Sequence, residues 1–307
     1  MTMKIPQPIP YQGSKRNIAK HILSFFPQDI ELLVEPFAGS AAISIAAAIK
    51  GKASKFYLND SNASLMNLWI EMINNPGQIS DEYRKLWNAQ LGKEKEFYNY
   101  IRDEFNKEQR PDYFLYLLAR CIKASVRYNS KGEFNQSPDN RRKGRKPEIM
   151  KKDIFAVSKL FKGRVKITSS DYKEILASIS SNDLVYMDPP YQGVCNGRDP
   201  RYYSKIDNDE FIEQLQKLVK KNISFILSYD GRTENKTYGK NIPENIGVYR
   251  VEVNAGVSSQ STLLGKNETT YESIYLSKPL ILRLGRSIEN ITERFKNKQT
   301  IQQSLTK

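Results

Sequence analysis

Apolar residues occur along the chain in short runs, separated by longer stretches with apolar side chains at helical spacing. Seven runs have the length and composition of buried strands, at residues 31–34, 55–58, 164–168, 184–187, 223–228, 248–254 and 271–276. Helical patterns lie between most of them, at residues 41–49, at residues 63–73 and from Asp207 onward. Because strands and helices alternate, the pattern predicts an α/β fold with a doubly wound, mostly parallel, seven-stranded sheet.

Residues 75–150 break this alternation, because they hold helical patterns (83–106 and 112–123) but no convincing core strand. A turn-rich basic stretch follows, in which residues 141–152 carry seven Lys or Arg against one Glu. We interpret residues 75–150 as an insertion into a discontinuous domain made of residues 1–74 and 151–285. Residues 286–307 form a polar C-terminal tail. A solvated surface loop is the alternative interpretation of the basic run.

The numbers of charged, histidine and cysteine residues limit the classes of function that the chain can have. The 307 residues include 48 Lys and Arg against 34 Asp and Glu, a formal charge of +14, which favours a polyanionic partner. One histidine, His21, and two separated cysteines, Cys121 and Cys195, leave no ligand set for zinc, so we expect no metal. The N-terminus lacks a signal-peptide core, and no apolar run is long enough to span a bilayer. These features predict a cytoplasmic protein without a membrane partner.

The strongest chemical signal is the strand at residues 184–187, which runs directly into Asp-Pro-Pro-Tyr. The two prolines fix φ and donate no backbone hydrogen bond, so the Asp188 carboxylate and the Pro189 carbonyl can point the same way. Two adjacent acceptors suit an –NH2 group, which has two protons to donate. Tyr191 offers a flat face on which a ring can stack. The motif therefore predicts a pocket for a planar ring with an exocyclic amine. An ordinary surface turn is the alternative.

A second group of signals indicates a nucleotide-like ligand. The strand at residues 31–34 meets a small-residue turn around Gly39 that opens an Ala-rich helix, and Asp60 ends the next strand 21 residues later. An acid at that distance is the usual partner of ribose hydroxyls, although Asp60 can instead cap the helix that begins at Ala63. Lys15 stands in a Gly-Ser turn before a predicted helix at residues 18–26, where it can hold a carboxylate or phosphate. Asp171 ends a further strand.

Taken in order, the motifs PYQGSK, VEPFAGSAA, LND, RYNSKGEFNQS, SSD, MDPPYQG and ILSYDG resemble the Dam-like (D12, alpha-group) class of DNA N6-adenine methyltransferases. The resemblance covers residues 8–277. It implies a Rossmann-like methyltransferase fold, S-adenosylmethionine as cofactor and double-stranded DNA as substrate. It implies a target-adenine pocket formed by Asp188, Pro189, Pro190 and Tyr191. It implies cofactor binding by Tyr11, Lys15, Glu35, Phe37, Gly39, Asp60, Asp171 and Asp188.

The same resemblance makes the insertion a DNA-recognition element with a helical part and a hairpin. Residues 127–136 look like the DNA-contacting hairpin of the family, and the basic run that follows is suited to phosphates. The DNA-binding residues would be Arg127, Asn129, Lys131, Asn135, Gln136, Arg141, Arg142, Lys143 and Arg145. Two positions depart from the family pattern. Ala41 replaces a second glycine, a change that is tolerated if the backbone there is helical. Gln136 and Ser137 replace an apolar stretch typical of GATC-reading enzymes, so GATC is not implied.

The resemblance therefore implies transfer of a methyl group from S-adenosylmethionine to N6 of a flipped-out adenine in duplex DNA. The setting would be restriction-modification, with a cognate restriction endonuclease acting separately, or modification by a phage or virus. The enzyme would act as a monomer, at the bacterial nucleoid or in the host cell. The pocket argument also fits cytosine N4 in DNA or adenine in RNA. A non-catalytic DNA-binding regulator on a methyltransferase scaffold is the alternative from a different class.

Overall fold

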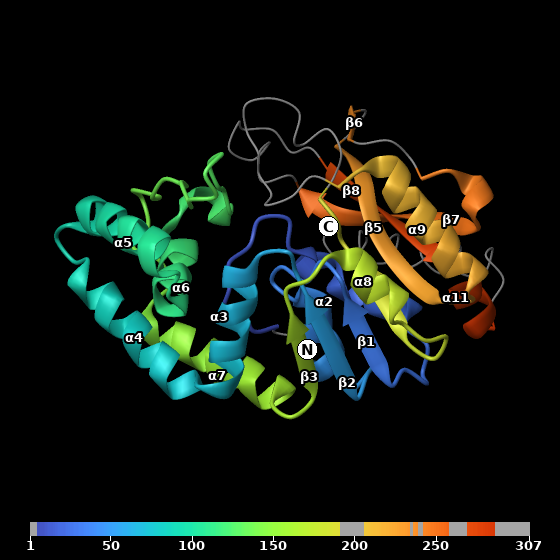
Figure 1. Cartoon of the computed structure of the whole chain (residues 1–307), viewed down its shortest axis with the longest axis horizontal. Helices are drawn as coiled ribbons and strands as arrows, with labels where there is room; N and C mark the ends of the chain where they lie inside the picture. Colours follow the sequence, from blue (N-terminus) through green and yellow to red (C-terminus); the bar gives the residue numbers. More distant parts are fainter. Residues whose placement is uncertain (1–4, 191–205, 234–235, 239–241, 258–268, 286–307) are drawn as a thin grey trace, which may run out of the picture.

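The computed structural model describes residues 5–190, 206–233, 236–238, 242–257 and 269–285 (Figure 1). Its centre is one sheet in the order β3-β2-β1-β4-β5-β8-β7, with β6 paired to β5. The strands are β1 Leu32–Glu35, β2 Lys55–Asn59, β3 Val165–Thr168, β4 Leu184–Met187, β5 Ser224–Thr233, β6 Lys236–Tyr238, β7 Val248–Val257 and β8 Thr269–Ser277. All seven predicted strands are present, and the short β6 is an addition that the apolar pattern did not indicate.

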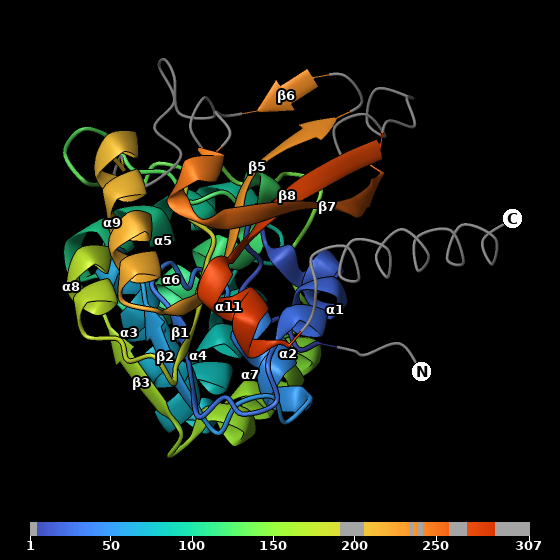
Figure 2. The ribbon, with the colours of Figure 1, turned by 90° about the vertical axis from the view of Figure 1, so that its right-hand side faces the viewer.

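The first five strands of the sheet are parallel, whereas β8 pairs antiparallel with β5 and β7 pairs antiparallel with β8. Alternate residues of β4 enter opposite layers. Leu184 and Tyr186 belong to the core under α1, α2, α3 and α7, whereas Val185 and Met187 belong to the core under α9. Figure 2 shows α8 and α9 on one side of the sheet and α1 and α2 on the other. The predicted doubly wound, mostly parallel architecture is confirmed.

The helices that complete these layers precede or follow the strands along the chain. Around the parallel strands lie α1 Ala19–Ile22, α2 Ala42–Ile49, α3 Ala63–Asn74, α7 Pro147–Phe161, α8 Tyr172–Ala177, α9 Asn208–Lys220 and α11 Lys278–Arg283. Helix α1 continues from the 3₁₀ turn Lys15–Ile18 into a second one, Leu23–Phe25, so the predicted helix at residues 18–26 is a mixed helical segment. Helix α9 begins where predicted, because the Asp207 side chain accepts hydrogen bonds from the backbone N–H groups of Asp209 and Glu210.

The insertion consists of α4 Pro76–Ala89, α5 Glu94–Glu108 and α6 Pro111–Arg120, followed by a hairpin (Figure 1). The helix predicted over residues 83–106 is interrupted, because the chain turns at Gly92, which has a φ of 84°. Phe105 and Phe114 stack at 4.9 Å, and Phe134 of the hairpin packs edge-on against both rings. This core is continuous with the core on the α2 face of the sheet. Helix α7 crosses the boundary that we drew at residue 150.

The hairpin lies between α6 and α7. Tyr128 and Phe134 form an antiparallel bridge, and the Asn129 N–H donates to the Glu133 carbonyl at 2.9 Å. Gly132, at a φ of 77°, makes the left-handed turn that closes it. The backbone therefore has the hairpin form that the resemblance implied for residues 127–136. No helix within the described ranges is both long and apolar enough to cross a membrane.

Candidate active site

The candidate residues gather where the strand order of the sheet reverses. Strands β1 and β4 are parallel neighbours, and their carboxyl ends lead to the turn at Gly39 and to Asp188. In the order β3-β2-β1-β4-β5, the chain crosses from β3 on one side of β1 to β4 on the other. Ligands of doubly wound sheets bind outside the carboxyl ends of the strands at such a switch point. The sheet therefore brings the two strongest sequence motifs to one edge.

The turn after β1 is held by contacts to Gly39. Its N–H donates to Asp60 Oδ2 at 3.0 Å, and its carbonyl accepts from Trp69 Nε1 at 3.0 Å. Gly39 has a φ of 48°, and a Cβ atom there would lie 3.2 Å from Tyr11 Cε1. Both the backbone conformation and the close approach of the Tyr11 ring therefore favour glycine at this position. The same contacts bring the PYQGSK segment against the turn.

Ala41 is the position that departs from the family pattern. Its backbone is left-handed, with φ 47° and ψ 34°, and its side chain is fully buried at the start of α2. The right-handed helical conformation that would accommodate a methyl group is therefore not the one observed. An alanine in this region is strained by about 1 kcal/mol relative to glycine. The hydrogen bond from its N–H to the Ala38 carbonyl, at 2.6 Å, holds the turn closed.

Asp60 faces this turn rather than capping a helix. Its Oδ1 accepts from the Asn62 N–H at 3.0 Å, and its Oδ2 accepts from Gly39. The N-cap of α3 is Asn62, whose side chain accepts from the Leu65 N–H. The capping alternative for Asp60 is therefore wrong. Desolvation raises the pKa of the Asp60 carboxyl, while the two backbone hydrogen bonds lower it.

A buried asparagine joins the second and third strand ends. Asn59 donates to the carbonyls of Pro36 and Ser170 and accepts from the Ser170 N–H at 2.9 Å. It thereby fixes the LND and SSD motifs beside the β1 turn. Asp171 follows Ser170 and accepts from the Lys173 N–H as the N-cap of the short helix α8.

The Asp188 side chain meets a buried cation. Lys15 Nζ lies 2.9 Å from Asp188 Oδ1, 3.9 Å from Glu272 Oε2, and 3.1 Å from the Gly13 carbonyl, which accepts from it. The Lys15 side chain is only 7% exposed, so the carboxylates are needed to compensate its charge. Behind them, the hydroxyls of Tyr186 and Ser228 are hydrogen bonded at 2.8 Å and tie β4 to β5. Pro189 is buried, Pro190 is half-buried, and Tyr191 lies outside the described residues.

Glu35 and Phe37 line the base of the β1 turn. Glu35 is 2% exposed and accepts from the Ser44 N–H at 2.6 Å. Burial raises the pKa of its carboxyl to about 8, against the opposing effect of the Ser44 hydrogen bonds, and the nearby charge of Asp188 adds to the rise. Phe37 packs against Tyr172 with ring centroids 5.1 Å apart. The end of β1 thus offers a carboxyl held in a dry environment beside a group of aromatic rings.

The predicted DNA-binding residues divide by accessibility. Five are exposed: Lys131, Asn135, Arg141, Arg142 and Lys143. Arg141 and Arg142 flank the buried Asp139 at 3.4 and 3.1 Å, and Lys143 pairs with Glu94.

The other predicted DNA-binding residues are engaged within the fold. Asn129 organises the hairpin turn, because its Oδ1 accepts from the N–H groups of Lys131 and Glu133. Gln136 is 6% exposed, and Arg127 is half-buried. Arg145 pairs with Asp153 at 2.7 Å and donates to the Gln7 carbonyl.

Sequence reasoning missed three residues that build the site: Glu272, Trp69 and Asn62. The first belongs to β8, whose apolar pattern marks a strand but does not mark a carboxylate facing Lys15. The other two lie in or beside α3, where a buried tryptophan and a polar residue before a helix have ordinary structural interpretations. Their contacts with residues far away in the sequence, which only the structure shows, assign these three residues to the site.

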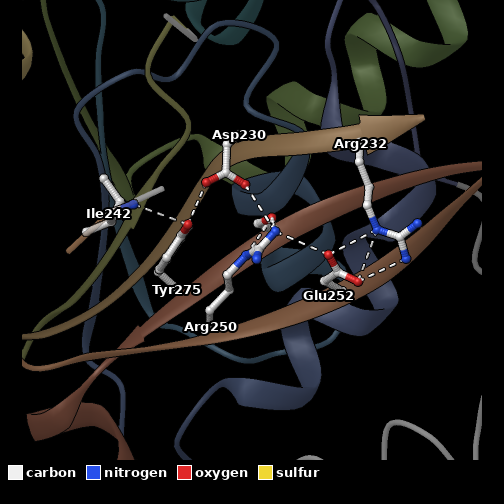
Figure 3. Close-up of polar contacts among 7 residues, drawn as sticks. Asp230, Arg232, Ile242, Arg250, Glu252 and Tyr275 are labelled. Atoms are coloured by element: carbon white, nitrogen blue, oxygen red, sulfur yellow. Dashed lines mark hydrogen bonds and ion pairs between the residues drawn. The ribbon is translucent and has the colours of Figure 1, made fainter. Parts of the chain in front are cut away.

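The ILSYDG motif has a structural place beyond the switch point (Figure 3). Asp230 is fully buried at a register shift of β5 and accepts from the Tyr275 hydroxyl at 2.5 Å. Arg250 lies 3.8 Å from Asp230 and 3.2 Å from Glu252, which also pairs with Arg232. These contacts connect β5, β7 and β8 where they extend past the parallel strands. Within the described residues, no group of three or more His, Cys, Asp or Glu is placed to hold a metal ion.

A family model matches most of the chain. Residues 11–256 match the model of the D12 class N6 adenine-specific DNA methyltransferase. The type II methyltransferase M.MjaIII of Methanocaldococcus jannaschii is 30% identical over 237 residues, which cover 71% of this chain and 81% of that protein. The retron Ec67 DNA adenine methylase of Escherichia coli is 30% identical over 193 residues, 61% of this chain and 64% of that protein. Type II methyltransferase M1.LlaDCHI of Lactococcus lactis is 30% identical over 191 residues, which cover 59% of this chain and 64% of that protein.

Proposed function

Because the chain belongs to the D12 class N6 adenine-specific DNA methyltransferases, we propose that it methylates adenine N6 at a specific duplex DNA sequence with S-adenosylmethionine as cofactor. The observation that carries the proposal is the pairing of Lys15 with Asp188 at the switch point, beside the Gly39 turn. The bound cofactor supplies an activated methyl group. The residues of this chain then have to bind, orient and desolvate the two reactants.

The turn after β1 fits such a cofactor. Gly39 has no side chain, so a ligand can approach the backbone of the turn closely. Asp60 lies beside Gly39 and has a carboxylate suited to ribose hydroxyls. Tyr11 covers the turn, while Phe37 and Tyr172 offer aromatic surface below it. Glu35, Lys15 and Asp171 would complete the set that holds the polar groups of the cofactor. A methyl group on Gly39 would intrude on this cradle, as its 3.2 Å approach to Tyr11 indicates.

Asp188 would receive the target amine. Adenine N6 is a poor nucleophile because its lone pair is delocalised into the ring. A carboxylate has about four lone-pair positions, so Asp188 can accept from the amine while its Oδ1 remains paired with Lys15. With the Pro189 carbonyl as second acceptor, both amine protons are bound, which favours a pyramidal nitrogen aligned for direct displacement. Tyr191 would stack on the flipped base.

The insertion would hold the DNA. Exposed Arg141, Arg142 and Lys143 follow a hairpin that presents Lys131 and Asn135, which suits phosphate contacts around a base-reading loop. We place Arg127, Asn129, Gln136 and Arg145 in supporting positions, because their side chains are engaged within the fold or buried. One flipped base needs one site, so we propose a monomer that acts without a restriction endonuclease bound to it. A DNA substrate is consistent with the bacterial nucleoid or an infected host cell.

The test is transfer of a tritiated methyl group to unmethylated genomic DNA and, separately, to total RNA. Digestion and chromatography then identify the methylated base. We expect N6-methyladenine in DNA only, and none from the Asp188→Asn variant. Label in N4-methylcytosine or in RNA would replace the proposal with the corresponding alternative. Cofactor binding without any transfer would favour the DNA-binding regulator.

A further inference from the structure

The hairpin of the insertion is bonded directly to a residue beside the proposed cofactor pocket. Asn62 Nδ2 donates to the Tyr128 hydroxyl at 3.0 Å, and that hydroxyl lies 3.4 Å from Asn62 Oδ1, to which it donates. Asn62 is 4% exposed, and its Oδ1 also caps α3. A buried side chain with this many partners has little freedom to reorient without breaking a hydrogen bond. The contact therefore fixes Tyr128 relative to the start of α3.

From Asn62 the bonds continue to the turn after β1. The Asn62 N–H donates to Asp60 Oδ1, and Asp60 Oδ2 accepts from the Gly39 N–H, both at 3.0 Å. The Asp60 carboxylate thus bridges the LND segment and the small-residue turn. Anything that binds this carboxylate restrains the backbone from which the Asn62 side chain extends.

On its other side, Tyr128 belongs to a rigid part of the insertion. Its ring packs edge-on against Phe134, with centroids 5.9 Å apart, and the two residues are bridged across the hairpin. Phe134 is fully buried, and both its N–H and its carbonyl are bonded to the Asn106 side chain of α5. A displacement of Tyr128 therefore displaces the hairpin as a unit.

A second contact docks the same region on the other proposed cofactor segment. The Gln12 N–H, within PYQGSK, donates to the Ala124 carbonyl at 3.0 Å. Lys123 and Ala124 both have positive φ, 57° and 50°, a conformation that costs non-glycine residues about 1 kcal/mol each. Such strain persists only where the surroundings hold it. The N-terminal arm of the hairpin region is thus attached at two points, Ala124 and Tyr128, to segments beside the proposed cofactor pocket.

We propose that Asn62 and Tyr128 are positioning residues that couple the DNA-contacting hairpin to the cofactor pocket. Cofactor bound at Asp60 strengthens DNA binding at the hairpin, and DNA strengthens cofactor binding by the same factor, because binding linkage is reciprocal. This inference rests on the proposed function, since it takes Asp60 as a cofactor residue and the hairpin as a DNA contact. Neither residue touches the reacting atoms in this scheme.

The experiment measures the dissociation constant of S-adenosylhomocysteine by calorimetry, with and without a duplex carrying the sequence methylated in cells. The ratio of the two constants is the coupling factor. Tyr128→Phe removes only the hydroxyl, and Asn62→Ser keeps a helix-capping side chain too short to reach Tyr128. Tyr98→Phe is the matched control, because its hydroxyl donates to the Gln136 carbonyl within the insertion, away from Asn62.

We expect wild type and Tyr98→Phe to share a coupling factor of about five or more, in the usual range for linked sites. Tyr128→Phe and Asn62→Ser should each reduce the coupling factor by about five-fold, the worth of one hydrogen bond. Tyr128→Phe, which alters only the hairpin side of the contact, should leave the affinity for S-adenosylhomocysteine alone unchanged. Full coupling in both variants, or none in the wild type, overturns the inference while leaving the methyltransferase proposal intact. Failure of the wild type to bind S-adenosylhomocysteine at all would instead count against the proposed function.

Discussion

Replacing the buried Glu35 by glutamine should make the protein more stable, and increasingly so as the pH rises. Glu35 is 2% exposed, and burial raises the pKa of its carboxyl from 4.5 to about 8. The folded protein therefore keeps a proton that the unfolded chain releases. Stability falls with rising pH wherever the folded state binds more protons. The destabilisation is absent below about pH 4.5 and complete above about pH 8. Glutamine retains the acceptor oxygen for the Ser44 N–H but does not titrate.

The size of the effect follows from the two pKa values. Each pKa unit corresponds to about 1.4 kcal/mol, so the full penalty on the wild type is about 5 kcal/mol above pH 8. The difference between the free energies of unfolding of Glu35→Gln and the wild type should therefore increase by about 2 kcal/mol from pH 6 to pH 8. An effect of this size is large against a typical total stability of roughly 5–15 kcal/mol.

Urea unfolding at pH 6, 7 and 8 measures this difference directly. Glu31→Gln is a suitable control, because Glu31 precedes the same strand but is 66% exposed and paired with Lys55, which lowers its pKa. Its unfolding midpoints should stay parallel to those of the wild type over this range. If the Glu35→Gln midpoints also run parallel to the wild type, Glu35 is ionised in the folded protein and the reasoning is refuted.

Three further substitutions test the turn and the DNA surface. Gly39→Ala, at a φ of 48° and 3.2 Å from the Tyr11 ring, should cost about 1 kcal/mol in urea unfolding and weaken S-adenosylhomocysteine binding in calorimetry. Unchanged binding would remove the turn from the cofactor site. Trp69→Phe deletes the hydrogen bond to the Gly39 carbonyl and leaves a gap, so we expect a loss of about 2–3 kcal/mol on unfolding; a loss below 0.5 kcal/mol would show that this support is dispensable. Arg142→Ala should make the dependence of DNA binding on salt less steep in filter binding to duplex DNA. The slope of the logarithm of the association constant against the logarithm of the salt concentration should decrease in magnitude by about 0.9. An unaltered slope would assign Arg142 to its pair with Asp139 alone.

The architecture was predictable because each strand carries its signal locally. Buried parallel strands such as β4 are apolar runs that end in marked residues, so both their position and the chemistry at their ends can be read from the sequence. The early helix and the helix predicted over residues 83–106 were described less accurately. In the second case the left-handed turn at Gly92 interrupts a continuous helical pattern. The early segment instead passes from a 3₁₀ turn through one α-helical turn into a second 3₁₀ turn.

The site was predictable only in part, since motifs name residues but not the contacts between them. The role of Asp60 beside Gly39 follows a known spacing, whereas Glu272 reaches Lys15 from a strand more than 250 residues away. The conformation of Ala41 shows another limit. Its N–H is bonded to the Ala38 carbonyl and its side chain is buried, in a left-handed backbone conformation that alanine by itself does not favour. Similarly, Gln136 has the chemistry of a base-reading residue but is buried by the fold of the insertion.

Sequencing of DNA from cells that express the chain, with detection of methylated bases, tests the central claim most directly. The control is the Asp188→Asn variant, which keeps the size of the side chain but loses the charge that meets Lys15 at 2.9 Å. We predict N6-methyladenine within one short sequence motif in the first culture and its absence in the second. The same motif methylated in both cultures would show that Asp188 is not required, and no new methyladenine in either would contradict the adenine methyltransferase account.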